Sequence, residues 1–246
     1  MNISIFDSSE AVAHALAERM ADALRANRES VLGLTAGRTP IAAYAELRQM
    51  YARGDLDWSA ASTFNLDEFV GVDSQHPGSF RQFMQRHLFE GLNLNPARIY
   101  FLNGAAADLE AECRRYEKAI RAAGGIDLQI LGIGGNGHIG FNEPADELIA
   151  ATHRVTLLDT TRRDNAALFG NDPARVPSEA LSMGVGTILR ARRILLVATG
   201  AKKARCIAQS VNGTVTTRVP ASLVQVHCDV ELLLDRGAAA LVGPTP

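Results

Sequence analysis

The sequence predicts an α/β fold, a Rossmann-like three-layer sandwich in which a mostly parallel central sheet carries helices on both faces. Two observations support this prediction. Short apolar runs alternate along the chain with segments of helical periodicity. The runs 127–134 and 192–200 are apolar nearly throughout, as is typical of strands buried on both faces of a parallel sheet. Since the chain has 246 residues, we expect one domain over 1–246.

Each element follows from its own local pattern. The first helix has apolar residues at steps of three and four behind Ser8 or Ser9, either of which can cap it. Pro40 can open the second helix. The expected helices are 9–25, a segment after Pro40 through Tyr51, 80–88 and 108–122. The expected strands are 30–35, 62–66, 98–102, 127–134, 192–200 and 230–235.

Composition excludes several classes of function. Lys and Arg number 25 against 27 Asp and Glu, so the net charge of −2 offers no basic field to nucleic acid or to a membrane surface. No apolar run approaches the length of roughly 18 residues needed to span a bilayer, and the N-terminus lacks the pattern of a signal peptide. We therefore expect a cytoplasmic protein. The three cysteines, Cys113, Cys206 and Cys228, lack zinc-site spacing and are expected to be reduced.

Four polar loops follow four of the predicted strands. Because ligands bind at the carboxyl ends of parallel strands, the loops 35–40, 65–71, 134–144 and 199–203 are expected to meet around one site. The region 145–180 has weaker periodicity, and we expect it to form a mobile lid.

The loop 134–144 holds the first candidate residues. The segment GIGGNG (132–137), which leads into this loop, matches the GxGxxG pattern of dinucleotide-binding folds, but no helix follows, so a nicotinamide cofactor is not expected. We interpret it as a loop whose backbone, Gly137 included, approaches a ligand and presents His138 and Glu143. A lone histidine is often only a surface or core residue, but the proximity of Asn136 and Glu143 favours proton transfer. No second histidine lies at ligand spacing, so no metal is expected.

Acidic and basic residues follow the other strands. Asp67 ends an apolar run and is predicted to be a general base, whereas Glu68 is better explained as a helix cap or a solvated turn. The loop 35–40 presents Gly37, Arg38 and Thr39 just before Pro40, an arrangement that can bind an anion. Lys202 and Lys203 are either surface charges or phosphate contacts.

Five segments together resemble the glucosamine-6-phosphate deaminase family, which shares a superfamily with 6-phosphogluconolactonases. They are TFNLDEFVG (63–71), LEAECRRYE (109–117), LGIGGNGHIGFNEP (131–144), ALSMGVGTIL (180–189) and RRILLVATGAKKA (192–204). The resemblance is strongest to the shorter bacterial forms, in keeping with the short C-terminal end GPTP. The GHIGFNEP segment favours the deaminases, because lactonases lack the glutamate that corresponds to Glu143.

The resemblance implies an enzyme that converts glucosamine 6-phosphate to fructose 6-phosphate and ammonia without a metal or organic cofactor. His138 would move a proton from the anomeric hydroxyl to the ring oxygen, and Glu143 would orient its imidazole. Asp67 would remove the proton on carbon 2 if its surroundings raise its basicity. Asn136 stands where the family often has an aspartate. Its amide can accept a hydrogen bond from the imidazole but carries no charge, so His138 is expected to rely more on Glu143.

Two segments depart from the family pattern at the phosphate site. The usual Thr/Ser-Gly-Gly-Thr-Pro loop reads Ala-Gly-Arg-Thr-Pro here, and the lid arginine is replaced by Ala167. We hypothesise that Arg38, or Arg163 one helical turn before Ala167, supplies the missing charge beside Lys203. The competing explanation is a changed substrate, such as galactosamine 6-phosphate.

Allosteric residues of the longer deaminases are also absent, since the corresponding positions hold His153 and Val155. We therefore expect no activation by N-acetylglucosamine 6-phosphate. Alternative functions are a 6-phosphogluconolactonase and a non-catalytic phosphosugar sensor. Such sensors normally carry a DNA-binding extension, whereas this sequence opens on a strand, and a sensor does not need all three catalytic residues. The expected partner is a phosphosugar, and the oligomeric state is left open.

Overall fold

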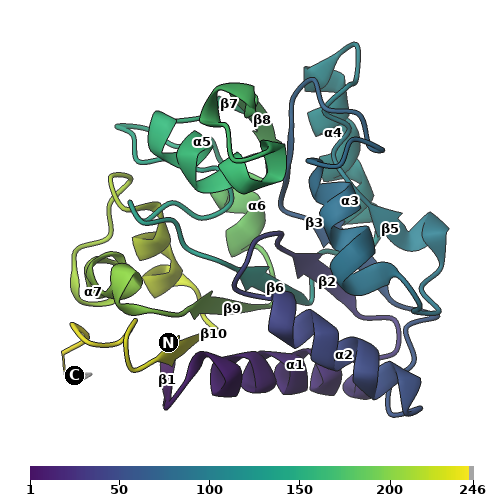
Figure 1. Cartoon of the computed structure of the whole chain (residues 1–246), viewed down its shortest axis with the longest axis horizontal. Coiled ribbons are helices and arrows are strands. Elements are labelled where there is room, and N and C mark those ends of the chain that lie inside the picture. Colours follow the sequence, from purple (N-terminus) through teal and green to yellow (C-terminus); the bar gives the residue numbers. More distant parts are fainter. Residues whose placement is uncertain (244–246) are drawn as a thin grey trace.

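The structure, a computed structural model, describes residues 1–243 and is built around a seven-stranded sheet (Figure 1). The strand order is β1-β10-β9-β6-β2-β3-β5, and every neighbouring pair is parallel. The strands are β1 (Asn2–Phe6), β2 (Val31–Leu34), β3 (Ser62–Asn65), β5 (Ile99–Tyr100), β6 (Leu128–Leu131), β9 (Arg193–Ala198) and β10 (Val230–Asp235). The last three residues of the GPTP end lie outside the described residues.

Helices cover both faces of this sheet. One face packs against α1 (Ser9–Ala26) and α2 (Ile41–Ala52), and the other against α4 (Leu109–Ala122), α6 (Val185–Leu189) and α7 (Ala204–Asn212). Strand β9 alternates accordingly, since Leu195 and Val197 enter the first core and Ile194 and Leu196 enter the second. This double burial explains the continuous apolar strand sequences and confirms the predicted three-layer sandwich.

Capping residues set several of the helix boundaries. The Ser8 hydroxyl accepts a hydrogen bond from the Ala11 N–H at the start of α1, and the Asp108 carboxylate caps α4 in the same way. Pro40 directly precedes α2, as expected. The third predicted helix has the expected extent but is not one continuous α-helix. It divides into α3 (Phe80–Met84) and a π-helical turn, η1 (Gln85–Phe89).

A second, antiparallel sheet was not predicted. It consists of β4 (Asp67–Phe69), β8 (Glu179–Ser182) and β7 (His153–Thr156), so the segment 65–71 is partly strand and not simply a loop. Between β7 and β8 lie α5 (Asp159–Asn165) and the short 3-10 helices η3 (Ala166–Phe169) and η4 (Pro173–Arg175). Figure 1 shows this group above the carboxyl ends of the central strands. These strands have three or four residues each, too few for a periodic sequence pattern.

An aromatic cluster holds this group against α3 and the glycine-rich loop. The Phe69 ring lies 4.7 Å from Phe80 and 5.2 Å from Phe169, measured between ring centroids, and Phe141 packs beside them. Because Phe141 belongs to the glycine-rich loop and Phe169 to η3, apolar packing joins the predicted lid to the loop that carries His138.

Short 3-10 helices also occur between the main elements. Three further 3-10 helices are η2 (Pro96–Arg98), η5 (Ala201–Lys203) and η6 (Pro220–Val226). All three cysteines are free, with Cys113 and Cys206 buried and Cys228 exposed. Within residues 1–243, no helix combines the length and the apolar character required to cross a bilayer.

Candidate active site

A cavity of about 430 Å³ lies at the carboxyl ends of the central strands. The four loops expected to meet there do so. The predicted site residues in the cavity wall are Gly37, Arg38, Thr39, Asp67, His138 and Lys203. Three predicted residues lie outside that wall. Asn136 and Glu143 contact His138 from behind, and Gly137 packs against Val219.

The loop carrying His138 is a tight turn held by backbone hydrogen bonds. The Gly134 N–H donates to the His138 carbonyl oxygen at 2.9 Å, and the Gly137 N–H donates to the Gly134 carbonyl oxygen at 3.0 Å. Gly137 has a φ of +89°, and its carbonyl oxygen accepts from the Ala221 N–H. Gly137 therefore shapes and anchors the loop, whereas we had expected it to approach the ligand.

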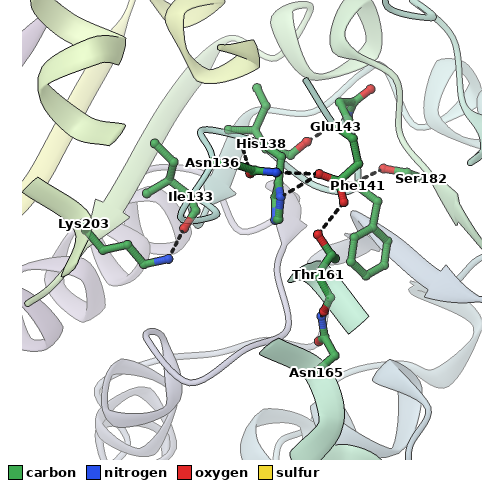
Figure 2. A network of polar contacts seen from close by, with 11 residues as sticks. Ile133, Asn136, His138, Phe141, Glu143, Thr161, Asn165, Ser182 and Lys203 are labelled. Atoms are coloured by element: carbon green, nitrogen blue, oxygen red, sulfur yellow. Dashed lines mark hydrogen bonds and ion pairs between the residues drawn. The ribbon is translucent and has the colours of Figure 1, made fainter. Parts of the chain in front are cut away.

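His138 and Glu143 form a hydrogen-bonded pair (Figure 2). The imidazole Nδ1 lies 3.2 Å from Glu143 Oε2, and the Asn136 side-chain amide donates to the same oxygen at 2.9 Å. Asn136 Oδ1 accepts from the backbone N–H of His138 at 3.1 Å. The Asn136 amide therefore does not accept from the imidazole but orients the carboxylate and the loop backbone, and the imidazole contacts Glu143.

The surroundings of Glu143 keep it ionised. Burial by itself would raise its pKa, but hydrogen bonding and charge from His138, with hydrogen bonds from Thr161 and Asn136, lower the pKa to about 2. An ionised carboxylate next to Nδ1 favours the tautomer with the proton on Nδ1. The other ring nitrogen, Nε2, is then free to accept or donate a proton in the cavity.

Asp67 and Glu68 point to opposite sides of β4, as successive strand residues must. Asp67 lines the cavity and is only 6 % exposed. Burial, and then the negative charge of Glu68, raise the pKa of Asp67 to about 8. This is the increase in basicity that a carboxylate needs to act as a base on a carbon acid.

The contacts of Glu68 indicate a structural role. Its carboxylate accepts hydrogen bonds from the backbone N–H groups of Phe69, Phe80 and Arg81, so it caps the start of α3. Burial raises the pKa of Glu68 to about 7 against the opposing effect of these hydrogen bonds. The helix-cap explanation from the sequence is therefore correct, although the side chain is buried and not solvated.

One part of the cavity wall is cationic. Arg38 is exposed there beside Thr39, and the Lys203 ammonium donates to the Ile133 carbonyl oxygen at 2.7 Å. The loop 35–40 is held in place by the Tyr44 hydroxyl, which donates to the Thr35 carbonyl oxygen. With Lys202, which also lines the cavity, this wall offers three cations, a hydroxyl and the start of α2 to an anionic group.

Helix α5 contributes residues that sequence analysis missed. Asp164 and Asn165 line the cavity, whereas Arg163 and Ala167 do not. Arg38 is thus better placed than Arg163 to replace the lid arginine. Thr161 is buried and donates its hydroxyl hydrogen to Glu143 Oε1. No pattern in the sequence marks these residues, because α5 is short and its chemistry depends on what it packs against.

The cavity wall holds no cluster of metal ligands. Within the described part of the chain, one group of histidine and carboxylates is close enough to share an ion. It consists of His14, Glu18 and Glu46 on α1 and α2. None of the three lines the cavity.

Comparison with known proteins covers most of the chain. Residues 6–233 match the profile of the family described as glucosamine-6-phosphate isomerases/6-phosphogluconolactonase. A glucosamine-6-phosphate deaminase of Halothermothrix orenii is 50 % identical over 214 residues, which are 87 % of this chain and 88 % of that protein.

Solved structures agree with this relationship. A monomeric glucosamine-6-phosphate deaminase is 39 % identical and superposes with a TM-score of 0.95, covering 98 % of this chain and 100 % of that one. The 6-phosphogluconolactonase of Trypanosoma brucei superposes with a TM-score of 0.74 at 17 % identity, with 98 % of each chain covered. The second comparison supports a common fold.

Proposed function

The chain belongs to the family of glucosamine-6-phosphate isomerases and 6-phosphogluconolactonases, and on that basis we propose that it is a glucosamine-6-phosphate deaminase. The reaction converts glucosamine 6-phosphate and water to fructose 6-phosphate and ammonia. One observation carries this proposal. A basic carboxylate, Asp67, and an imidazole, His138, face a single cavity that Arg38 and Lys203 also line.

The first step is opening of the sugar ring. His138 takes the proton of the anomeric hydroxyl on Nε2 and returns a proton to the ring oxygen, which leaves an open-chain aldehyde. Glu143 holds Nδ1 and stabilises the imidazolium formed between the two transfers. Asn136 assists by keeping the carboxylate in place.

The second step is isomerisation. Asp67 removes the proton on carbon 2, and the electrons of that bond form an enolamine as the carbonyl oxygen is protonated. Return of a proton to carbon 1 gives an imine at carbon 2. Water then adds to that carbon and ammonia leaves, so the atoms of substrate and water are all accounted for in the two products.

The phosphate is bound at the cationic wall. Its charge suits Arg38, Lys203 and the Thr39 hydroxyl, which lie together there. We propose that the segment 145–180 closes over the sugar as a lid, because α5 contributes Asp164 and Asn165 to the cavity from above. Protection of backbone amides in 159–169 from hydrogen exchange should increase when fructose 6-phosphate is added.

The site is complete within one chain, so we expect the protein to be active as a monomer of 26.4 kDa. A phosphorylated sugar is charged and does not cross a bilayer by itself, so it stays in the compartment where it is made. We therefore expect the enzyme to work in the cytoplasm. Light scattering during gel filtration at the assay concentration tests the first expectation.

Ammonia release tests the proposed function directly. Purified protein is assayed with glucosamine 6-phosphate and, in parallel, with galactosamine 6-phosphate and 6-phosphogluconolactone. We expect rapid ammonia release from the first substrate only and its loss in Asp67→Asn. Release from the galacto epimer alone would instead favour a changed substrate, and lactone hydrolysis without ammonia would favour a lactonase.

A further inference from the structure

Thr161 contacts the ring-opening pair without lining the cavity. It lies on α5, is 1 % exposed and donates its hydroxyl hydrogen to Glu143 Oε1. The other carboxylate oxygen of Glu143, Oε2, accepts from His138 and Asn136. Both oxygens of the carboxylate are therefore held, one by the loop of His138 and the other by a helix from a separate part of the fold.

The Thr161 hydroxyl affects the Glu143 carboxylate in two ways, through its orientation and through its charge. A carboxylate fixed at both oxygens cannot rotate, so the direction in which it accepts from Nδ1 is set. Donation by Thr161 also draws negative charge toward Oε1 and weakens the hold of Glu143 on the imidazole proton. The imidazole keeps its orientation and remains able to lose its proton.

The same helix also contacts the cavity. Asn165 lines the cavity wall, and its side-chain amide donates to the Thr161 carbonyl oxygen at 2.9 Å. One turn of α5 thus connects the Asn165 side chain, which lines the cavity, to Thr161, whose hydroxyl donates to Glu143 (Figure 2). Any displacement of α5 from the loop would break the hydrogen bond to Glu143.

We propose that Thr161 is a positioning residue for the ring-opening step, which makes the orientation and basicity of His138 depend on the seating of helix α5. The proposal rests on the deaminase function proposed above. It predicts that ring opening is efficient only while α5 is in place over the cavity.

Three variants separate this role from simple packing. Thr161→Val keeps the shape and removes the hydroxyl, Thr161→Ser keeps the hydroxyl and removes a methyl group, and Thr160→Val makes the same change at an exposed neighbour. Since hydrogen bonds to charged groups are the stronger ones, we expect kcat of Thr161→Val to fall roughly tenfold to a hundredfold. Its KM should change little. Thr161→Ser should recover most of the activity, and Thr160→Val should match the parent.

The second measurement does not need turnover. The imidazole of His138 is titrated by NMR in protein labelled at histidine, with the resonance assigned from His138→Gln. Besides Glu143, the charged groups that share the cavity with His138 are Arg38, Asp67, Asp164, Lys202 and Lys203. Thr161→Val alters none of them. Loss of the Thr161 hydroxyl removes one of the hydrogen bonds that lower the pKa of Glu143, so the pH dependence of the His138 resonance should differ from that of the parent protein.

Two results would overturn the proposal. One is a Thr161→Val protein with unchanged kcat and an unchanged His138 titration. The other is a loss of activity that Thr161→Ser does not restore and that leaves the titration unmoved, since Thr161 would then serve packing alone. If the parent protein releases no ammonia but the titration still shifts, the deaminase function fails while the coupling stands.

Discussion

The His138 ring lies directly against Gly134. A Cβ at position 134 would come within 2.3 Å of the imidazole Cε1, so the ring occupies space that any other residue would fill. The close approach holds the imidazole against its own loop, between the cavity and Glu143.

Gly134→Ala should therefore displace the imidazole and lower kcat by about a hundredfold or more, because small misplacements of a catalytic group are costly. Thermal unfolding should change by only a few degrees, since the displaced ring lies at a cavity and not in the core. Kinetics and circular dichroism on the same sample check both. Full activity in this variant would show that the ring position is not constrained.

The pKa of Asp67 predicts the pH dependence of the reaction. With a pKa of about 8 in the free protein, its base form increases about tenfold per pH unit below that value. We expect kcat/KM to rise with pH between about 6 and 8 and then to level off. A profile that is flat across this range would contradict the assignment of Asp67 as the base. Measurement at fixed ionic strength is required, because salt screens the nearby charges.

Asp67 should also reduce stability at neutral and alkaline pH. Its pKa is about 8 in the folded protein and near its ordinary value of 3.8 in the unfolded chain, so folding favours the protonated form. Stability is therefore unaffected below pH 3.8 and is lost as pH rises toward 8. Asp67→Asn should raise the Tm at pH 8 by several degrees, a gain of about 2 kcal/mol or more. The gain should vanish near pH 4, and a gain that is constant with pH would argue against this cause.

Arg38 should contribute to phosphate binding. Arg38→Ala is expected to raise the KM for glucosamine 6-phosphate about tenfold with a smaller effect on kcat, since a partly exposed cation contributes mainly to binding. Arg163→Ala provides a matched control, because that arginine is exposed and lies outside the cavity wall. Equal effects of the two substitutions, or no effect of the first, would assign the missing charge elsewhere.

Activation by N-acetylglucosamine 6-phosphate should be absent. The positions where basic residues are expected for that ligand hold His153 and Val155 on β7. Rates should follow a hyperbola in substrate with or without the compound. A sigmoidal curve that the compound makes hyperbolic would show that a different set of residues binds it.

Sequence patterns were sufficient for the central fold. Strands such as β9 and β10 are buried on both faces, so their composition alone marks them, and helix α1 carries both its apolar stripe and its capping serine. Asp67, His138 and Lys203 could be selected because each follows such a strand, and parallel strands bring their carboxyl ends together.

The second sheet could not be predicted in this way. Strand β4 has three residues, and β7 has four residues of which Val155 is the one apolar residue, so neither is long enough to show a periodic signal in the sequence. Both strands form because they pair with β8. For β4, the paired residues of β8 are more than a hundred residues away in the sequence. Pairing over such a separation is a property of the folded chain.

The amino-acid sequence by itself determined the layered α/β fold, the four loops at the site and the chemical types of the groups in them. Only the tertiary structure decided the protonation states of these groups and which further residues contact them. Burial makes Asp67 a stronger base, while three donors around Glu143 outweigh the same burial and keep it ionised. Thr161 joins the site only because α5 packs over it. Proton affinity depends on burial and on nearby donors and charges, and these come from residues that are distant in the chain.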